Sequence, residues 1–279
     1  MAFSVNVNPT ALSALRNLNN TSTQLSVTQN RINTGLKINS AKDNAAVFSI
    51  AQKLRADLRG FGAVKQSLDR SIGTVDVAMA AATAISDILI SMKEKAVAAA
   101  DQGLDQTSRN ALAEDFNSLK TQINTIIQNA SFNGSNLIDN GTTDVTAITN
   151  PDATQVLTVV HQDLSLGSGS VGTNITITTQ QSITTQTAAA AAVTALVTSL
   201  NNVNSALTKL GAGASSLEQT RVFSDRISDV IETGIGNLVD ADLAKESANL
   251  QALQVKQQLG IQALSIANQS PQAILSLFQ

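Results

Sequence analysis

The chain has 279 residues, a formal net charge of −3, no Cys, no Trp, no Tyr and a single His. The lack of Cys excludes disulfides and thiolate chemistry, and one His argues against histidine-based metal or triad chemistry. The weak net charge argues against a nucleic-acid partner, because phosphate binding needs clustered Lys and Arg, and no window approaches the ~18 consecutive apolar residues of a membrane span.

The start of the chain, residues 1–6, lacks the basic residues and apolar run of a cleavable secretory signal. This leaves open a cytosolic protein, or one exported by a machine that reads another signal. Charges are unevenly placed further along. Between Lys120 and Lys209 there is no Lys or Arg, and the acids there are Asp139, Asp144, Asp152 and Asp163. The middle of the chain therefore differs in charge composition from its two ends.

Residues 9–34 are predicted to form the first helix, with Gly35 as its stop. Positions in a 4-3 alternation form a mainly apolar stripe typical of a coiled coil. These positions hold Ala11, Leu15, Leu18, Ser22, Leu25, Gln29, Ile32 and Leu36.

Ser40 and Asp43 then resemble a capping box, and a long helical pattern runs from there to about residue 100. Asp101-Gln102-Gly103 is predicted to break it. A further helix is expected over residues 107–129, with a stripe of Leu112, Phe116, Leu119, Ile123 and Ile126. Residues 131–134 end in Asn-Gly and predict a turn, because this pair readily adopts positive φ.

Residues 139–187 are rich in Thr and Gly and predict a small β-rich segment with loops. The strand candidates are residues 156–160 and 174–178. His161 lies in a polar stretch there and is expected at the surface. The Gly167–Ser170 run lacks a nearby Lys and a helix start, so we interpret it as a turn rather than a phosphate loop.

Helix is expected again from Ala188 to about Thr233, with residues 211–213 as a weak point and residues 234–236 as its end. Asp240 is the predicted N-cap of the last helix, and Pro271 is predicted to bend or end it. One 4-3 register in that helix holds Leu243, Leu250, Leu253, Leu264, Ala267 and Ile274, but it also places Gln257, Gly260 and Pro271 on the stripe.

The predicted fold class is mainly α: a long antiparallel helical hairpin or coiled-coil rod with a small β-rich excursion in the middle of the chain. Pairing is the simplest way to bury two terminal apolar stripes. We expect three parts: a terminal coiled-coil domain of residues 1–39 with 237–279, a helical domain of 40–138 with 188–236, and a variable region at 139–187.

Three segments together resemble the bacterial flagellin family. Residues 31–46 read R-I-N-T-G-L-K-I-N-S-A-K-D-N-A-A, residues 132–138 read F-N-G-S-N-L-I, and residues 257–278 resemble the family's C-terminal end. The resemblance covers about residues 1–138 and 215–279, with the motifs in the family's order. It implies a non-enzymatic subunit of the flagellar filament, for swimming motility, with no cofactor.

The resemblance also implies type III export of the unfolded chain. Its partners would be other copies of itself, flagellar cap and junction proteins and an export chaperone. The subunit itself would be secreted and lie outside the cell in the filament. The terminal stripes would form the assembly seam, where a lone terminal helix roughly breaks even between ordering its backbone and burying its stripe. The seam residues are Leu15, Leu18, Leu25, Ile32, Leu36, Leu243, Leu250, Leu253, Leu264 and Ile274. On spacing alone, an ordinary intramolecular bundle is an equal alternative.

Two other functions and a metal site fit the sequence less well. A hook-filament junction protein of the same flagellar family has similar termini, although the run at residues 37–46 and the Leu-Ser-Leu-Phe ending favour flagellin. An enzyme carried on the filament is disfavoured, because the middle has about fifty residues with one His and no acid-rich pocket motif. Asp240, Asp242 and Glu246 have ligand-like spacing, but without accompanying His they indicate a helix cap and a solvated face rather than a metal site.

Two further expectations follow from the resemblance. An innate immune receptor binds many flagellins where the family reads Gln-Arg-x-Arg-Glu-Leu, and here Ile90, Ser91, Lys93 and Lys95 stand in that stretch, with Asp115 as the acid on the partner helix. This implies weak or no receptor activation, because the first Arg with its planar guanidinium is gone. The family often carries O-linked sugars, for which the candidates are Thr142, Thr143, Ser168, Ser170, Thr176 and Thr178.

Overall fold

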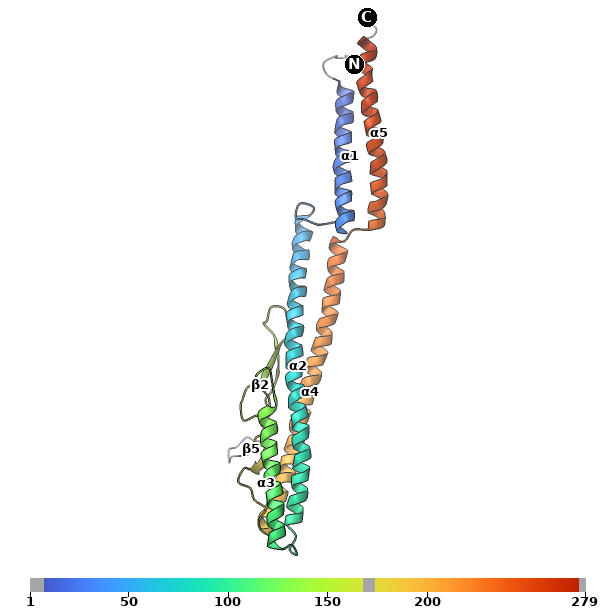
Figure 1. Ribbon diagram of the computed structural model, residues 1–279. Coiled ribbons are helices and arrows are strands. Elements are labelled where there is room, and N and C mark those ends of the chain that lie inside the picture. Colours follow the sequence, from blue (N-terminus) through green and yellow to red (C-terminus); the bar gives the residue numbers. More distant parts are fainter. Residues whose placement is uncertain (1–7, 168–173, 276–279) are drawn as a thin grey trace. The chain divides into compact units, whose positions relative to one another are not determined.

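The computed structural model describes residues 8–167 and 174–275, which form five helices and six short strands (Figure 1). The helices are α1 (Pro9–Thr34), α2 (Ala45–Ala99), α3 (Gln106–Asn129), α4 (Gln186–Val239) and α5 (Leu243–Leu275). The strands are β1 (Ser131–Phe132), β2 (Ser135–Asn136), β3 (Val145–Ile148), β4 (Val156–Val159), β5 (Leu166–Gly167) and β6 (Ile175–Thr178). The prediction of a mainly α chain with a small β-rich part in the middle is confirmed.

The chain divides into two compact units: residues 1–56 with 230–279, and residues 57–229. In the first unit, α1 and α5 lie side by side and run antiparallel (Figure 1). The side chain of Asn8 caps α1 by accepting a hydrogen bond from the amide of Ala11, and α1 ends at Gly35, whose φ is +71°. The predicted bounds of this first helix are confirmed.

The start of the second helix was predicted too early. The Asp43 carboxylate does accept hydrogen bonds from the backbone N–H and the hydroxyl of Ser40. These contacts close a turn and not a helix, and they hold the pKa of Asp43 below its usual value. α2 begins at Ala45, because Asn44 is the residue whose side chain accepts the amide of Val47.

Three boundaries near the C-terminus also differ from prediction. α4 runs past its predicted end at Gly234–Gly236 to Val239, because packing outweighs the low helix propensity of Gly. Asp242 and not Asp240 caps α5, accepting the amides of Ala244 and Lys245. α5 also continues past Pro271 to Leu275.

The second unit packs α2, α3 and α4 against one another through stripes with 3-4 spacing. α2 and α4 run antiparallel, with ion pairs from Lys65 to Asp225 and from Arg221 to Asp69. In α3 the fully buried positions include Phe116 and Ile123, as expected. The rest of the predicted stripe is only half-buried, and its neighbours lie in the core instead. The largest fully buried side chains in this unit are Leu68, Ile85, Leu89, Met92, Phe116, Ile123, Leu137, Ile138, Leu164, Ile175, Ile177 and Ile183.

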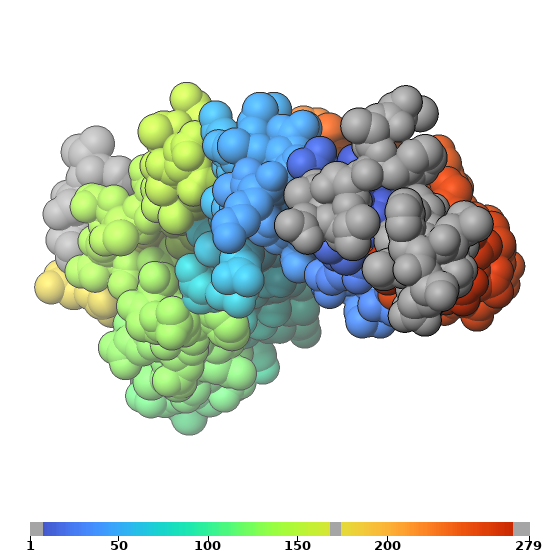
Figure 2. All heavy atoms as spheres, turned by 90° about the horizontal axis from the view of Figure 1, so that it is seen from above, coloured from blue at the N-terminus to red at the C-terminus, as the bar shows by residue number. Residues whose placement is uncertain are grey.

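The middle segment pairs its strands two by two: β1 with β2, β3 with β4, and β5 with β6, the last pair being parallel. β4 and β6 confirm the two strand candidates, whereas β3 and β5 were not predicted. The lime-green middle segment lies against the cyan part of α2 (Figure 2). There the lack of a side chain at Gly60 of α2 leaves room for Pro151. On α4 the lack of a side chain at Gly213 leaves room for Val159, so β4 packs against the helix at the predicted weak point.

The long helix α2 also contains an 18-residue window with a mean hydropathy of 1.6, enough by length and composition for a membrane span. This is weak evidence, because the core helix of a soluble protein gives the same signal. In α2 the buried residues recur at 3-4 spacing and include Leu68, Val75 and Leu89. We interpret α2 as a core helix.

Candidate assembly surfaces

The facing sides of α1 and α5 form an inner seam, which we define by its half-buried and buried residues. On α1 they are Ala11, Ala14, Leu18, Thr21, Leu25, Thr28, Arg31 and Ile32, and on α5 they are Glu246, Leu250, Leu253, Gln257, Gly260, Leu264 and Ala267. The register on α5 is the predicted one. On α1 the second residue of each heptad is one position earlier than predicted, so Ala14 faces α5 and Leu15 does not.

Polar contacts lie at both ends of the inner seam. At one end the amide nitrogen of Asn8 donates to the carbonyl of Ala267, 2.7 Å away. At the other end Arg31 Nη1 lies 3.1 Å from Glu246 Oε1, while the buried Glu246 Oε2 has no hydrogen-bond partner among the described residues. Between them Leu18 packs on Gly260, where a Cβ would lie 3.3 Å from its Cδ1. These contacts fix how the two helices are aligned.

Of the ten predicted seam residues, most lie at the inner seam in the single chain. Leu253 is buried, and Leu18, Leu25, Ile32, Leu250 and Leu264 are half-buried. Leu36 is half-buried beside α1, where it pairs with Asp240 in a short bridge. Leu15 and Leu243 are exposed, and the side chain of Ile274 lies outside the described residues.

A second apolar row lies on the other side of α5 and was missed by the sequence reading. Val255, Leu259 and Ile266 are 54%, 57% and 69% exposed. Spacings of four and seven residues place them on one face, and Val255 lies two residues, about 200°, beyond the inner-seam residue Leu253. We call these three residues the outer row. On α1, Leu12 and Leu15 are exposed in the same way.

The residues that align with the stretch recognised by the receptor in other flagellins lie on α2 and α3. Ile90 is exposed, and the Ser91 hydroxyl donates to the carbonyl of Asp87 on its own helix. Lys95 Nζ lies 2.8 Å from Asp115 Oδ2, which joins two of the altered positions in an ion pair. That hydrogen bond raises the pKa of Lys95.

The candidate glycosylation residues differ in access. Thr142 and Thr143 are exposed, whereas Thr178 is half-buried and the Thr176 hydroxyl is already hydrogen-bonded to the carbonyl of Ala195. Ser168 and Ser170 lie outside the described residues. The exposed hydroxyls of Thr142 and Thr143 are therefore the better placed acceptors.

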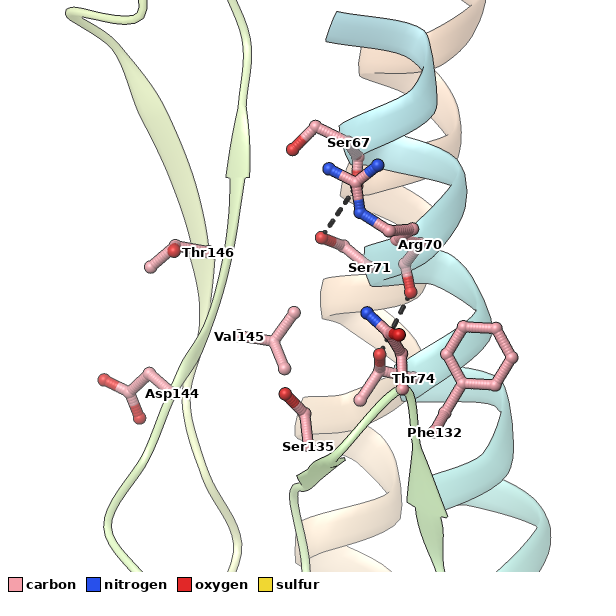
Figure 3. A pocket seen from close by; sticks show the side chains of 10 residues that line it. Ser67, Arg70, Ser71, Thr74, Phe132, Ser135, Asp144, Val145 and Thr146 are labelled. Carbon is pink, nitrogen blue, oxygen red and sulfur yellow. Dashed lines mark hydrogen bonds between the residues drawn. The ribbon is translucent and has the colours of Figure 1, made fainter. Parts of the chain in front are cut away.

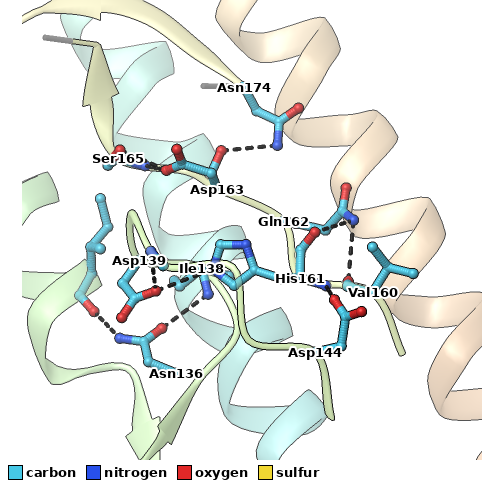
Figure 4. A network of polar contacts seen from close by, with 12 residues as sticks. Asn136, Ile138, Asp139, Asp144, Val160, His161, Gln162, Asp163, Ser165 and Asn174 are labelled. Atoms are coloured by element: carbon cyan, nitrogen blue, oxygen red, sulfur yellow. Dashed lines mark hydrogen bonds and ion pairs between the residues drawn. The ribbon is translucent and has the colours of Figure 1, made fainter. Parts of the chain in front are cut away.

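His161 was expected at the surface, and this is wrong. Its side chain is only 7% exposed, and Nε2 lies 3.1 Å from Asp139 Oδ1. Its backbone N–H donates to Asp144, so both acids hold this residue (Figure 4). The cluster ties the segment after β2 to the segment after β4. The stretch around His161 is polar, as the sequence indicates, but its polar groups form hydrogen bonds within the protein rather than with solvent.

A polar groove of about 200 Å³ lies where β3 and the β1–β2 hairpin meet α2 (Figure 3). The Ser67 hydroxyl accepts the amide of Ile148 there, which anchors β3 on the helix. Arg70, Thr74 and Phe132 also line the groove. Within residues 8–167 and 174–275, no three His, Asp or Glu side chains are grouped so that they could hold a metal ion.

Two buried cations on α3 were missed by the sequence reading. Lys120 donates to the carbonyls of Thr179 and Gln181, and burial lowers its pKa. Arg109 donates to the carbonyls of Asp101 and Leu104 and so closes the connection from α2 to α3. Both side chains occupy core positions and hold loops by their carbonyl oxygens.

Together, the structure defines a helical protein with one apolar face paired within the chain and another left open. Two family models match the sequence: the bacterial flagellin N-terminal helical region over residues 5–143, and the C-terminal helical region over residues 191–278. The chain belongs to the bacterial flagellin family. It is a structural subunit of the flagellar filament.

Individual flagellins are similar in sequence over almost the whole chain. The chain is 47% identical over 276 residues to flagellin FljM of Caulobacter vibrioides, covering 99% of this chain and 98% of the relative. It is 38% identical over 289 residues to a flagellin of Brucella melitensis, covering 99% of each. Among solved structures, a putative flagellar hook-associated protein from Vibrio parahaemolyticus has a TM-score of 0.53 at 15% identity, covering 71% of this chain and 100% of that one. At that identity the last match shows a shared fold only.

Proposed function

We propose that this subunit assembles through two apolar faces with different tasks. The inner seam holds α1 and α5 together within one copy, and the outer row of Val255, Leu259 and Ile266 contacts a neighbouring copy. The observation that carries this proposal is the exposure of the outer row, at 54%, 57% and 69%, on a helix whose opposite side is already covered by α1. A helix that is apolar on two opposite sides needs two partners.

The predicted seam residues fit this scheme as two groups. Leu18, Leu25, Ile32, Leu36, Leu250, Leu253 and Leu264 support assembly by fixing the α1–α5 pair, and Leu15 and Leu243, which are 42% and 49% exposed, join the contacts between copies. Few charges interrupt these helices: α1 and α5 carry only Arg16, Arg31, Lys245, Glu246 and Lys256. Identical copies can therefore pack closely without strong repulsion between like charges.

A pair of substitutions on α5 tests the division. Leu259→Ala should raise the critical concentration for polymerisation by about tenfold or more, because burying one Leu contributes about 1.5–3 kcal/mol. The monomer's helix content and melting should stay unchanged. Leu253→Ala, on the inner seam, should lower the melting temperature of the monomer as well. Sedimentation and circular dichroism distinguish the two; normal polymerisation of Leu259→Ala would contradict the outer row.

The surrounding biology is proposed on the family resemblance. The subunit is exported through the flagellum's type III apparatus with a chaperone, assembles with cap and junction proteins, and has no catalytic role. Residues 1–39 with 237–279 are the terminal coiled-coil domain of the inner filament, 40–138 with 188–236 are the helical domain, and 139–187 are the variable region, which faces solvent on the filament. Secretion should be lost in a strain lacking the export apparatus.

If Thr142 and Thr143 carry sugars, the intact mass of native protein will exceed the sequence mass.

Purified monomer is expected to activate the innate flagellin receptor poorly. The Asp115 carboxylate is held by Lys95 at 2.8 Å, and Ile90 and Ser91 lack the hydrogen-bonding groups of the family's Gln and Arg. Loss of an interface anchor can cost 2 kcal/mol or more, about thirtyfold in affinity. These residues can equally serve packing between copies, since the two roles are compatible.

A cell reporter assay measures the effect. The triple variant Ile90→Gln, Ser91→Arg and Lys95→Leu should gain at least about thirtyfold in potency over the natural chain. A flagellin with the full Arg-containing stretch provides the reference. Equal potency of the natural chain and that reference would show that the receptor does not read these positions.

A further inference from the structure

The chain contains two Asn-Gly pairs, Asn133-Gly134 and Asn140-Gly141, only seven residues apart. In such a pair the backbone nitrogen of Gly can attack the side-chain amide of Asn, since Gly has no Cβ to hinder the approach. The rate of this reaction depends on local geometry. The two pairs therefore form an internal comparison within one molecule.

Asn133 and Gly134 form the tight turn of the β1–β2 hairpin. Their φ angles are +50° and +81°, and the flanking residues Phe132 and Ser135 are paired across the strands. To bring the nitrogen of Gly134 onto its own side chain, Asn133 has to leave the left-handed turn and open the hairpin. The fold therefore protects this pair.

Asn140 is exposed and lies outside every helix and strand. The next amide, Gly141 N–H, donates to Asp139 Oδ1 at 2.8 Å. The same oxygen lies 3.1 Å from Nε2 of the buried His161, which fixes the carboxylate in place (Figure 4). A Cβ at position 141 would lie 2.8 Å from that oxygen, so a larger residue there would displace the carboxylate. A proton acceptor is thus already placed on the attacking nitrogen.

We propose that Asn140 is a self-modification site at which Asp139 acts as the base. The nitrogen of Gly141 attacks Cγ of Asn140, and its proton passes to Asp139 Oδ1. Asp139 returns the proton to Nδ2 as the Cγ–Nδ2 bond breaks, and the leaving group departs as ammonia. Water then opens the five-membered ring at either carbonyl to give aspartate or isoaspartate. One water is consumed, one ammonia is released, and no oxidant or cofactor is needed.

The product changes both charge and backbone at this point. A new carboxylate enters the stretch between Lys120 and Lys209, which already holds four Asp and no Lys or Arg. The isoaspartate form also inserts one carbon into the backbone beside Gly141, which moves its N–H away from Asp139. The contact between Asp139 and His161 then loses one of its supports. This proposal does not depend on the outer row or on filament geometry.

Full-length protein incubated in mildly alkaline buffer, followed by peptide mapping with isoaspartate standards, tests the proposal. In folded protein Asn140 should convert about tenfold or more faster than Asn133, since a positioned base accelerates proton transfer. In urea the two rates should converge. Asp139→Asn, which keeps the shape, should slow Asn140 to about the rate of Asn133 and leave Asn133 unchanged, with folding checked by circular dichroism.

His161→Gln should slow Asn140 partly, because the carboxylate is then free to turn. Equal rates at the two asparagines in folded protein would overturn the site. An unchanged rate at Asn140 in both Asp139→Asn and Asp139→Ala would overturn the role of Asp139 as base.

Discussion

Deleting residues 1–30 or residues 250–279 is expected to leave a soluble, partly helical monomer that forms no filaments. Either deletion removes most of one partner of the α1–α5 pair and leaves the unit of residues 57–229, with its own core, untouched. The remaining terminal helix then buries neither face, and ordering its backbone costs about 1–2 kcal/mol per residue. Sedimentation and electron microscopy measure the loss of filaments, and circular dichroism measures the helix that stays.

Single charges at the inner seam should act in the same direction. Leu25→Asp and Leu264→Asp each place a carboxylate on a half-buried face where no cation is paired with it. Leu253 is more deeply buried than either, and a charge there should also lower the monomer's stability. Long filaments from either truncated protein would refute the assembly role of the termini.

The helices were predictable because their apolar periodicity is long and their caps are local. α1 has Asn8 before it and Gly35 after it, and α3 has Asp105 before it, so neither depends on distant contacts. The register of α1 was not predictable in the same way. Ala14 is half-buried and Leu15 is exposed, although Leu15 is the larger apolar side chain, so size and apolar character alone do not identify the row that faces α5.

The buried cations could not be found from the sequence, because Lys and Arg are rarely in cores without partners. The partners of Lys120 are the carbonyls of Thr179 and Gln181, about sixty residues further along the chain. The same applies to His161, whose buried position depends on Asp139 and Asp144. Local polarity predicted exposure for this His, and long-range hydrogen bonds reversed it.

Gly211–Gly213 was predicted as a weak point inside the helix, on local propensity alone. α4 passes through both glycines without a break, and Gly213 is where the Val159 side chain approaches the helix backbone. Gly211 has no such neighbour. A glycine in a long helix can therefore mark a close contact rather than an end, and the tertiary structure distinguishes the two.

Gly60→Ala and Gly62→Ala should change the stability of the second unit in opposite directions. Ala is favoured over Gly inside a helix by about 0.8–1 kcal/mol, and nothing lies within 4 Å of a Cβ at position 62. Gly62→Ala should therefore stabilise the unit by up to that amount. At position 60 a Cβ would lie 2.6 Å from Cβ and 3.2 Å from Cα of Pro151, so the same change creates a clash.

The turn that carries Pro151 cannot easily move away. Asn150 holds it by accepting the amide of Gln155 and donating to Thr154, and Ile148 is anchored on Ser67 of α2. Overpacking of this kind costs about 1–3 kcal/mol, which exceeds the gain in helix propensity. Gly60→Ala should lower the free energy of unfolding by up to about 2 kcal/mol. Urea unfolding followed by circular dichroism measures both variants, and a stabilising effect of Gly60→Ala would show that β3 and β4 are not held against α2 at this point.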